Sequence, residues 1–311
     1  MPLKRLDCND GHSEESQDEL LADDSDVFDF ENRSSNLTLE IGLGDLNEEP
    51  STPASPGCVS IESNRESVGY VNFEVISAER VKDGNSTYVV YQILISGHGI
   101  EKTPGILHKR YSDFEKFNVK LRKKFPEIMD SVSFPGKVLV GNFKNETIAK
   151  RSRAFEQYLN HLMSLNEIRF SGETKEFFYE NEISNANEMI ASKNYSDAIS
   201  LLEKCLPVQE KLIGTTHIDV IKTLCALVVC FQALKDTERA LKYSITGLSC
   251  MEDSTDNPYY LPLLHTSIYL HWMLGKEKTH LEVKLGELRD RGIATETNTN
   301  LLDTVVKEMK S

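Results

Sequence analysis

Three cationic side chains occupy positions from which they could bind a phosphate group. Arg110 lies at the end of a predicted strand, directly before residues 111–114 (Tyr-Ser-Asp-Phe), which begin a predicted helix. Lys137 follows a Pro-Gly pair in a predicted turn, and Arg151 lies near the apolar line of a second predicted helix. A guanidinium can donate two parallel hydrogen bonds to a phosphate, and a helix N-terminus adds free amide donors. The three positions together predict an anion-binding cleft, in which Tyr111 offers a flat face to a sugar-like ring.

Each of these positions also has an ordinary structural explanation. Arg110 could be a surface charge at the end of a strand. Arg151 lies between two apolar residues at helical spacing, and an inward arginine needs an anionic partner. That partner could be an internal carboxylate or the phosphate of a ligand. Ser112 and Glu115 fit a capping box, so the serine could serve the helix rather than a ligand.

The elements that would hold these side chains follow from the periodicity of the apolar residues. The predicted strands are residues 70–78, 88–95 and 106–111. The predicted helices are residues 112–125, 146–163 and a further piece near 173–180, with a loop over 134–145. This order predicts an α+β domain over residues 67–182, a three-stranded antiparallel sheet followed by helices.

Four motifs of this segment resemble those of a known domain family. They are Arg-Tyr-Ser-Asp-Phe at 110–114, Phe-Pro-Gly-Lys at 134–137, Gly-Asn-Phe at 141–143 and the run Arg-Ser-Arg-Ala-Phe-Glu-Gln-Tyr-Leu at 151–159. Segment 67–182 resembles a PX (phox homology) domain, the phosphoinositide-binding module of the sorting nexins. One departure is visible, because the usual Pro-x-x-Pro before the lysine is reduced to Phe134-Pro135.

The resemblance implies a role for each residue of the predicted cleft. It implies that Arg110 binds the 3-phosphate of phosphatidylinositol 3-phosphate, with Tyr111 against the inositol ring and Ser112 beside the phosphate. It implies further that Lys137 binds the 1-phosphate and that Arg151 binds inositol hydroxyls. Four apolar residues after the lysine turn could enter the lipid interface or could instead pack inward: Val138, Leu139, Val140 and Phe143.

Residues 183–311 are predicted to be helical throughout, and their pattern repeats. The segment 194–206 matches 236–248 at a shift of 42 residues, and a further shift of about 40 residues aligns more leucines. Helix pairs at this period indicate a short tetratricopeptide-like (TPR-like) array, which typically holds a protein partner. Together with the PX domain, this resembles a sorting-nexin subgroup whose helical region is called the PX-associated domain B. That resemblance implies a peripheral protein of early endosomes that acts in protein transport, with an unidentified cargo or adaptor as its partner.

The charge of the chain is concentrated at its N-terminus. The formal net charge is −14, and residues 1–66 alone hold 17 acidic and 4 basic residues. With few bulky apolar residues, this tail is predicted to be disordered. Its patch at 26–30 (Asp-Val-Phe-Asp-Phe) could be a partner motif or part of a solvated tail. The acid could also compete for the basic cleft. The helical region is slightly acidic and no basic stripe with aromatics appears, so nucleic-acid binding is not expected.

No pattern typical of an enzyme appears in the sequence. There is no phosphate-binding glycine loop leading into a helix, no nucleophile elbow and no zinc-ligand spacing, so we expect no catalytic residue, cofactor or metal. Cys225, Cys230 and Trp272 lie in apolar helices and are predicted to be in the core. The apolar runs are too short to span a membrane, and the chain is expected to be cytosolic. The alternative to a lipid-binding adaptor is a protein-interaction scaffold that binds lipid weakly or not at all.

Overall fold

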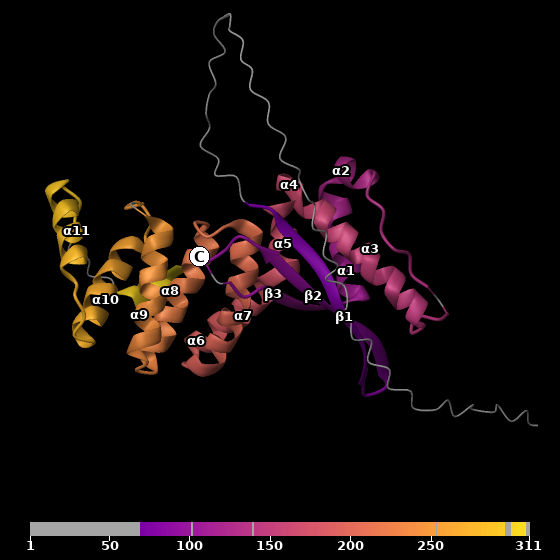
Figure 1. Cartoon of the computed structure of the whole chain (residues 1–311), viewed down its shortest axis with the longest axis horizontal. Coiled ribbons are helices and arrows are strands. Elements are labelled where there is room, and N and C mark those ends of the chain that lie inside the picture. Colours follow the sequence, from indigo (N-terminus) through magenta and orange to yellow (C-terminus); the bar gives the residue numbers. More distant parts are fainter. Residues whose placement is uncertain (1–68, 101, 139, 253, 296–299, 309–311) are drawn as a thin grey trace, which may run out of the picture.

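The computed structural model describes residues 69–100, 102–138, 140–252, 254–295 and 300–308. The predictions for the acidic tail, including its patch at 26–30, therefore lie outside the described residues, as does Leu139. A three-stranded sheet with its covering helices forms one part of the molecule. Helix α7 lies beside the sheet, and helices α8 to α11 extend away from it in chain order (Figure 1).

The sheet consists of three antiparallel strands in the order β1-β2-β3. Their bounds are β1 (Val71–Asp83), β2 (Ser86–Gly97) and β3 (Gly105–Arg110). The predicted alternation is present, because Phe73 and Val75 of β1 and Tyr91, Ile93 and Ile95 of β2 are all buried on the same side. The predicted three-stranded sheet is confirmed.

Short and long helices follow the sheet and cover it. They are α1 (Tyr111–Lys124), α2 (Pro126–Asp130), α3 (Asn145–Met163), α4 (Asn166–Arg169) and α5 (Gly172–Lys175). Pro126 occupies the first position of α2, where its missing N–H costs no helical hydrogen bond. The rings of Phe114 and Phe155 stack with centroids 3.8 Å apart, which joins α1 to α3 in the core. The α+β prediction is confirmed.

Side chains of α3 bind the backbone of the edge strand β1. Asn160 accepts a hydrogen bond from the Phe73 N–H at 3.1 Å and donates one to the Phe73 carbonyl at 2.9 Å. One helical turn earlier, Glu156 accepts from the Val75 N–H at 2.8 Å, next to a bulge in the strand. These bonds satisfy backbone groups that an edge strand would otherwise expose. They also hold α3, and hence Arg151, in a defined place relative to β1.

The rest of the described chain is helical, as predicted. Its elements are the π-helical turn η1 (Glu176–Glu180), α6 (Asn181–Ala191), α7 (Tyr195–Ile213), α8 (Ile218–Ala233), α9 (Thr237–Met251), α10 (Tyr260–Met273), α11 (Thr279–Asp290) and α12 (Leu301–Glu308). Each helix from α6 to α11 packs on the next one in the chain, whereas α12 returns to α8 and α10.

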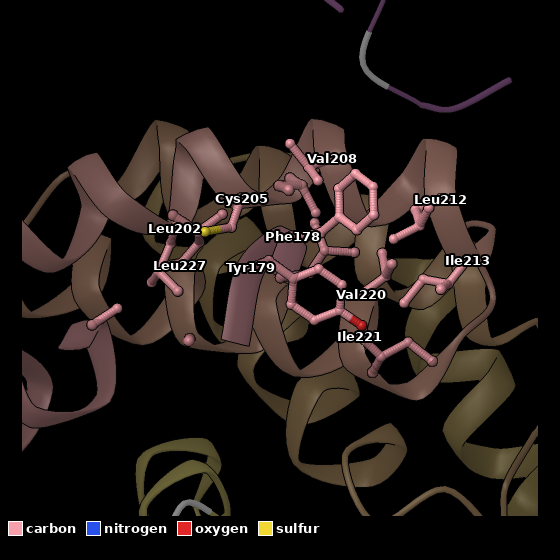
Figure 2. Close-up of a cluster of buried hydrophobic side chains, with 14 of the residues drawn as sticks. Phe178, Tyr179, Leu202, Cys205, Val208, Leu212, Ile213, Val220, Ile221 and Leu227 are labelled. Carbon is pink, nitrogen blue, oxygen red and sulfur yellow. The ribbon is translucent and has the colours of Figure 1, made fainter. Parts of the chain in front are cut away.

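Helix α7 joins the two parts of the molecule. Every residue from 205 to 213 is buried, because β2 and β3 pack on one side of the helix and α6 and α8 on the other. Figure 2 shows Phe178 and Tyr179 of η1 among side chains of α7 and α8. At the start of β3, a Cβ on Gly105 would lie 3.1 Å from the Cα of Val208, so only glycine allows this close approach.

One prediction about the core is wrong and another is confirmed. Trp272 is 63% exposed and its ring lies 6.0 Å from that of the exposed Tyr269. Helix α10 is apolar on nearly all sides, so the sequence could not show which side faces water. Cys225 and Cys230 are buried free thiols, as predicted, and burial raises the pKa of both to values where the thiol stays protonated. In the described residues, no helix is long and apolar enough to cross a membrane.

Candidate anion-binding site

Arg110 is the last residue of β3 and the N-cap of α1. Its guanidinium carbon lies 3.4 Å from the centroid of the Tyr88 ring on β2, and the side chain is exposed. Within the described chain it forms no ion pair, so its donors remain available to a ligand. The N-terminus of α1, with its free amides, begins at the next residue.

The predicted capping box of Ser112 and Glu115 is wrong. The N-cap is Arg110, so the helix begins at Tyr111, two residues earlier than a cap at Ser112 requires, and the third helical position holds Asp113. The Asp113 carboxylate accepts a hydrogen bond from the Arg110 N–H at 2.8 Å. Ser112 is therefore an exposed residue of the first turn rather than the cap. Its hydroxyl is left without a capping role.

Tyr111 ties the loop before α3 to the start of α1. Its hydroxyl donates a hydrogen bond to the Pro135 carbonyl at 2.9 Å. Its half-buried ring lies 5.9 Å from the ring of Phe134 and 6.2 Å from that of Phe155. Burial, with the nearby Glu115 carboxylate, raises the pKa of the Tyr111 hydroxyl, so it stays a hydrogen-bond donor. The tyrosine thereby places the turn that carries Lys137 beside the first turn of α1.

Arg151 is 6% exposed, yet no carboxylate among the described residues pairs with it. One Nη2–H donates to the Asn142 Oδ1 at 3.0 Å, and the guanidinium carbon lies 4.3 Å from the centroid of the Tyr111 ring. The Nε–H is buried without a hydrogen-bond partner. An internal carboxylate is therefore not the partner of Arg151 in this structure. A buried guanidinium with an unused donor is poised for an anion from outside.

The Tyr91 hydroxyl lies in the same neighbourhood and is also buried without a partner. Burial raises its pKa, and the charge of Arg151 offsets part of that rise. The phenol therefore remains neutral. The Tyr91 hydroxyl and the Arg151 guanidinium therefore lie close to each other in the core, where buried polar groups without a hydrogen-bond partner are uncommon.

Lys137 lies beside the first turns of α1. Its Nζ is 4.0 Å from the Glu115 Oε2, one helical turn after Tyr111, and 69% of its side chain is exposed. The structure therefore brings together the three cations that the sequence singled out. Arg110 precedes Tyr111, Arg151 stacks on its ring, and Lys137 lies beyond its hydroxyl.

Two exposed apolar side chains lie close to Lys137 in the chain. Val140 projects into solvent and is 85% exposed, whereas Val138 is only 37% exposed. Phe143 is only partly exposed. Its ring lies under Arg80 of β1, with 4.8 Å between the guanidinium carbon and the ring centroid. The sequence analysis did not single out Arg80, because this residue is far from every motif in the chain. Only the fold of β1 brings it beside Phe143.

The described residues contain no cluster of three or more histidine, cysteine, aspartate or glutamate side chains that could hold a metal ion. The chemistry that this part of the chain offers is therefore that of a cationic, aromatic-floored site. Its cations can bind and orient an anion.

Comparison with known proteins identifies the family. The PX domain family matches residues 101–181. Sorting nexin-21 of Mus musculus is 35% identical over 239 residues, which are 76% of this chain and 66% of the mouse protein. Sorting nexin-20 of Bos taurus is 33% identical over 216 residues, which are 69% of this chain and 68% of the cattle protein. A crystal structure of the mouse SNX19 PX domain is 19% identical, covers 35% of this chain and 96% of its own, and superposes with a TM-score of 0.30. The chain therefore belongs to the sorting nexin family, in which it is similar to sorting nexins 20 and 21, and it carries the PX domain.

Proposed function

We propose that this chain is a peripheral membrane adaptor that binds a phosphoinositide headgroup through its PX domain. The headgroup is that of phosphatidylinositol 3-phosphate, with Arg110 on the 3-phosphate, Lys137 on the 1-phosphate and Arg151 on inositol hydroxyls. Tyr111 packs against the inositol ring and Ser112 lies beside the phosphate. The helical region holds a protein cargo or adaptor, and the protein acts in sorting at early endosomes. Binding requires no catalytic step.

The observation that carries this proposal is the state of Arg151. A buried cation costs free energy unless it is paired and hydrogen-bonded, and this one has an amide oxygen, a ring face and an unused N–H. A headgroup supplies the missing acceptors. The exposed guanidinium of Arg110 lies at the neighbouring helix N-terminus, where a phosphate is also favoured by the amides of the first turn.

Apolar burial adds to the phosphate contacts. Val138, Val140 and Phe143, with Leu139 between the valines, follow Lys137 and would enter the lipid interface when the headgroup is bound. Each buried methylene contributes about 0.8 kcal/mol. Such a peripheral mode of binding needs both parts, because a few apolar side chains or a single headgroup contact alone hold a protein only weakly.

The test is the sedimentation of the full chain with phosphatidylcholine vesicles that contain phosphatidylinositol 3-phosphate. Control vesicles carry phosphatidylserine at matched charge. We expect Arg110→Gln to lower the affinity for the phosphoinositide vesicles at least tenfold, since it removes a charge-assisted hydrogen bond. Lys123→Gln is the matched control, because Lys123 is an exposed cation three turns further along α1. Its expected effect is at most about fivefold.

Equal losses for Arg110→Gln and Lys123→Gln would count against the assignment of the headgroup site. Equal binding of the wild-type chain to both kinds of vesicle would favour the alternative, a scaffold that is recruited through its helical region. Vesicles with other phosphoinositides, measured in the same way, test the preference for the 3-phosphate.

A further inference from the structure

We propose that Arg80 is a positioning residue for membrane binding. It holds the turn of residues 141–144 so that Asn142 orients Arg151 and Phe143 faces the membrane. The membrane part of this inference rests on the proposed function, whereas the effect of Arg80 on the turn can be measured without lipid.

The contacts of Arg80 reach the turn from the far edge of the sheet. Its guanidinium carbon lies 4.8 Å from the centroid of the Phe143 ring, and its Nη2–H donates to the Phe143 carbonyl at 3.4 Å. A cation over an aromatic face is attracted by the ring quadrupole. A single side chain thus binds both the ring and the backbone of the same residue, which limits its rotation.

The turn itself is tight and is bound at two neighbouring residues by two arginines. Gly141 has a φ of +83°, a conformation that favours glycine, and its carbonyl accepts a hydrogen bond from the Lys144 N–H at 3.1 Å. Arg151 binds the side chain of Asn142, and Arg80 binds Phe143. A displacement of Phe143 would therefore move Asn142, which is the hydrogen-bond partner of Arg151 in the described structure.

Arg80 is itself held by the sheet. It pairs with Val89 of β2, and the next residue of β2, Val90, pairs with Arg110 of β3. Arg80 and Arg110 therefore lie at the same end of the sheet, on the two strands that flank β2. Strand β1 is further bound to α3 through Glu156 and Asn160. Arg80 consequently connects the rigid sheet to the turn that must present Phe143.

The experiment compares two variants that remove the same charge from the same strand. Arg80 and Lys82 are exposed cations two residues apart, so their side chains leave the same face of β1. No contact of the Lys82 ammonium group with an aromatic ring or a carboxylate is found in the described chain. We expect Lys82→Gln to weaken binding to phosphatidylcholine vesicles with phosphatidylinositol 3-phosphate by at most about fivefold. Arg80→Gln should cost a further factor of about three, and Arg80→Lys should restore part of it.

A double-mutant cycle shows whether Arg80 acts through Phe143. In a Phe143→Ala background, the extra loss of Arg80→Gln over Lys82→Gln should shrink, because the ring is no longer there to be held and only the bond to the carbonyl of residue 143 remains. Equal effects of Arg80→Gln and Lys82→Gln in the wild-type background would overturn the inference. An extra loss of undiminished size without the phenylalanine ring would also overturn it, since Arg80 would then not act through that ring.

Amide hydrogen exchange of the lipid-free protein separates this inference from the proposed function. The Lys144 N–H, which closes the turn, should exchange several times faster in Arg80→Gln than in Lys82→Gln. Equal exchange in both variants would show that Arg80 does not hold the turn, whatever the lipid result. If the exchange differs but the wild-type chain does not bind the vesicles, the proposed function fails and the positioning role of Arg80 stands.

Discussion

Arg151 and Arg169 are two buried arginines that differ in how many of their donors form hydrogen bonds. Arg151 is 6% exposed and Arg169 is 5% exposed, and neither forms an ion pair with a described carboxylate. Arg169 donates to three backbone carbonyls, from Nε to Leu212 at 2.6 Å and from Nη2 to Lys211 at 3.1 Å and to Gly69 at 3.2 Å. Arg151 donates one hydrogen bond, to the side-chain oxygen of Asn142, and keeps an unused N–H.

The difference shows that Arg169 has a structural role, whereas Arg151 keeps a donor that the described chain does not use. The carbonyls of Lys211 and Leu212 belong to the last turn of α7, where helical partners are missing, so Arg169 satisfies groups that would otherwise stay unpaired. It closes the contact between the PX domain and the helical region. Burial lowers the pKa of Arg169, but an arginine in a protein stays protonated, so the side chain keeps its charge. Arg151 has one hydrogen-bond acceptor among the described residues, the side chain of Asn142.

The largest expected effect comes from the same substitution at both positions. Arg169→Met should lower the free energy of unfolding by about 3 kcal/mol, because three buried carbonyls lose their donor. Arg151→Met should change it by less than about 1 kcal/mol, since that side chain brings an unsatisfied donor into the core. Urea unfolding followed by circular dichroism measures both. Equal losses would mean that the two arginines are not distinguished by their hydrogen bonds.

The same two substitutions should affect lipid binding in the opposite order, with the larger loss of affinity in Arg151→Met. Arg151→Met should weaken binding to phosphatidylinositol 3-phosphate vesicles at least tenfold, because charged hydrogen bonds to the headgroup are lost. Arg169→Met, measured below its melting temperature, should stay within about twofold of the wild-type affinity. Vesicle sedimentation decides between them, with circular dichroism as the check that each variant is folded. A large loss for Arg169→Met in its folded state would link headgroup binding to the contact with the helical region.

The smallest of the three expected effects is a loss of stability in acid at Asp219, close to the contact that Arg169 closes. Asp219 of α8 accepts hydrogen bonds from Lys175 at 2.7 Å and from the Tyr179 hydroxyl at 3.0 Å. Burial raises the pKa of Asp219, but the bond and the charge of Lys175 lower it more, so it lies below its usual value. The pair therefore stabilises the fold above about pH 4 and is lost as the pH falls through the lowered pKa.

Asp219→Asn is the variant that tests this acid effect. The loss of stability between pH 5 and pH 3 should be smaller in Asp219→Asn than in the wild type, by about 1 kcal/mol or less. Urea unfolding at a series of pH values measures the difference. The same acid loss in both proteins would mean that other carboxylates govern the transition.

The parts of the site that could be predicted are those with local signals. Arg110 and Tyr111 stand where alternating residues give way to helical spacing, and Lys137 follows a Pro-Gly turn, so neighbouring residues alone mark them. The inward position of Arg151 followed from its place on an apolar helix face. The capping box of Arg110 and Asp113 was missed because it depends on whether the helix begins at Tyr111 or two residues later, a difference that periodicity does not resolve.

The parts that could not be predicted depend on contacts between distant segments. Arg80 contacts Phe143 across 63 positions of the chain, and Arg169 contacts Lys211 and Leu212 across more than 40. No local pattern records which carbonyl or ring a long side chain will reach. Trp272 was placed in the core because its helix is apolar, whereas its exposure depends on which neighbours pack around α10.

The sequence by itself determined the α+β order of the first region, the helical nature of the second, the motifs of the PX domain and the cations around Tyr111. Those properties follow from periodicity and from residues close together in the chain. Only the tertiary structure decided that Arg151 has no carboxylate partner, that Arg80 holds Phe143 and that α7 is buried between the sheet and the helical stack. These depend on packing, which brings distant backbone and side-chain groups within hydrogen-bonding distance and so determines which of them are left for a ligand.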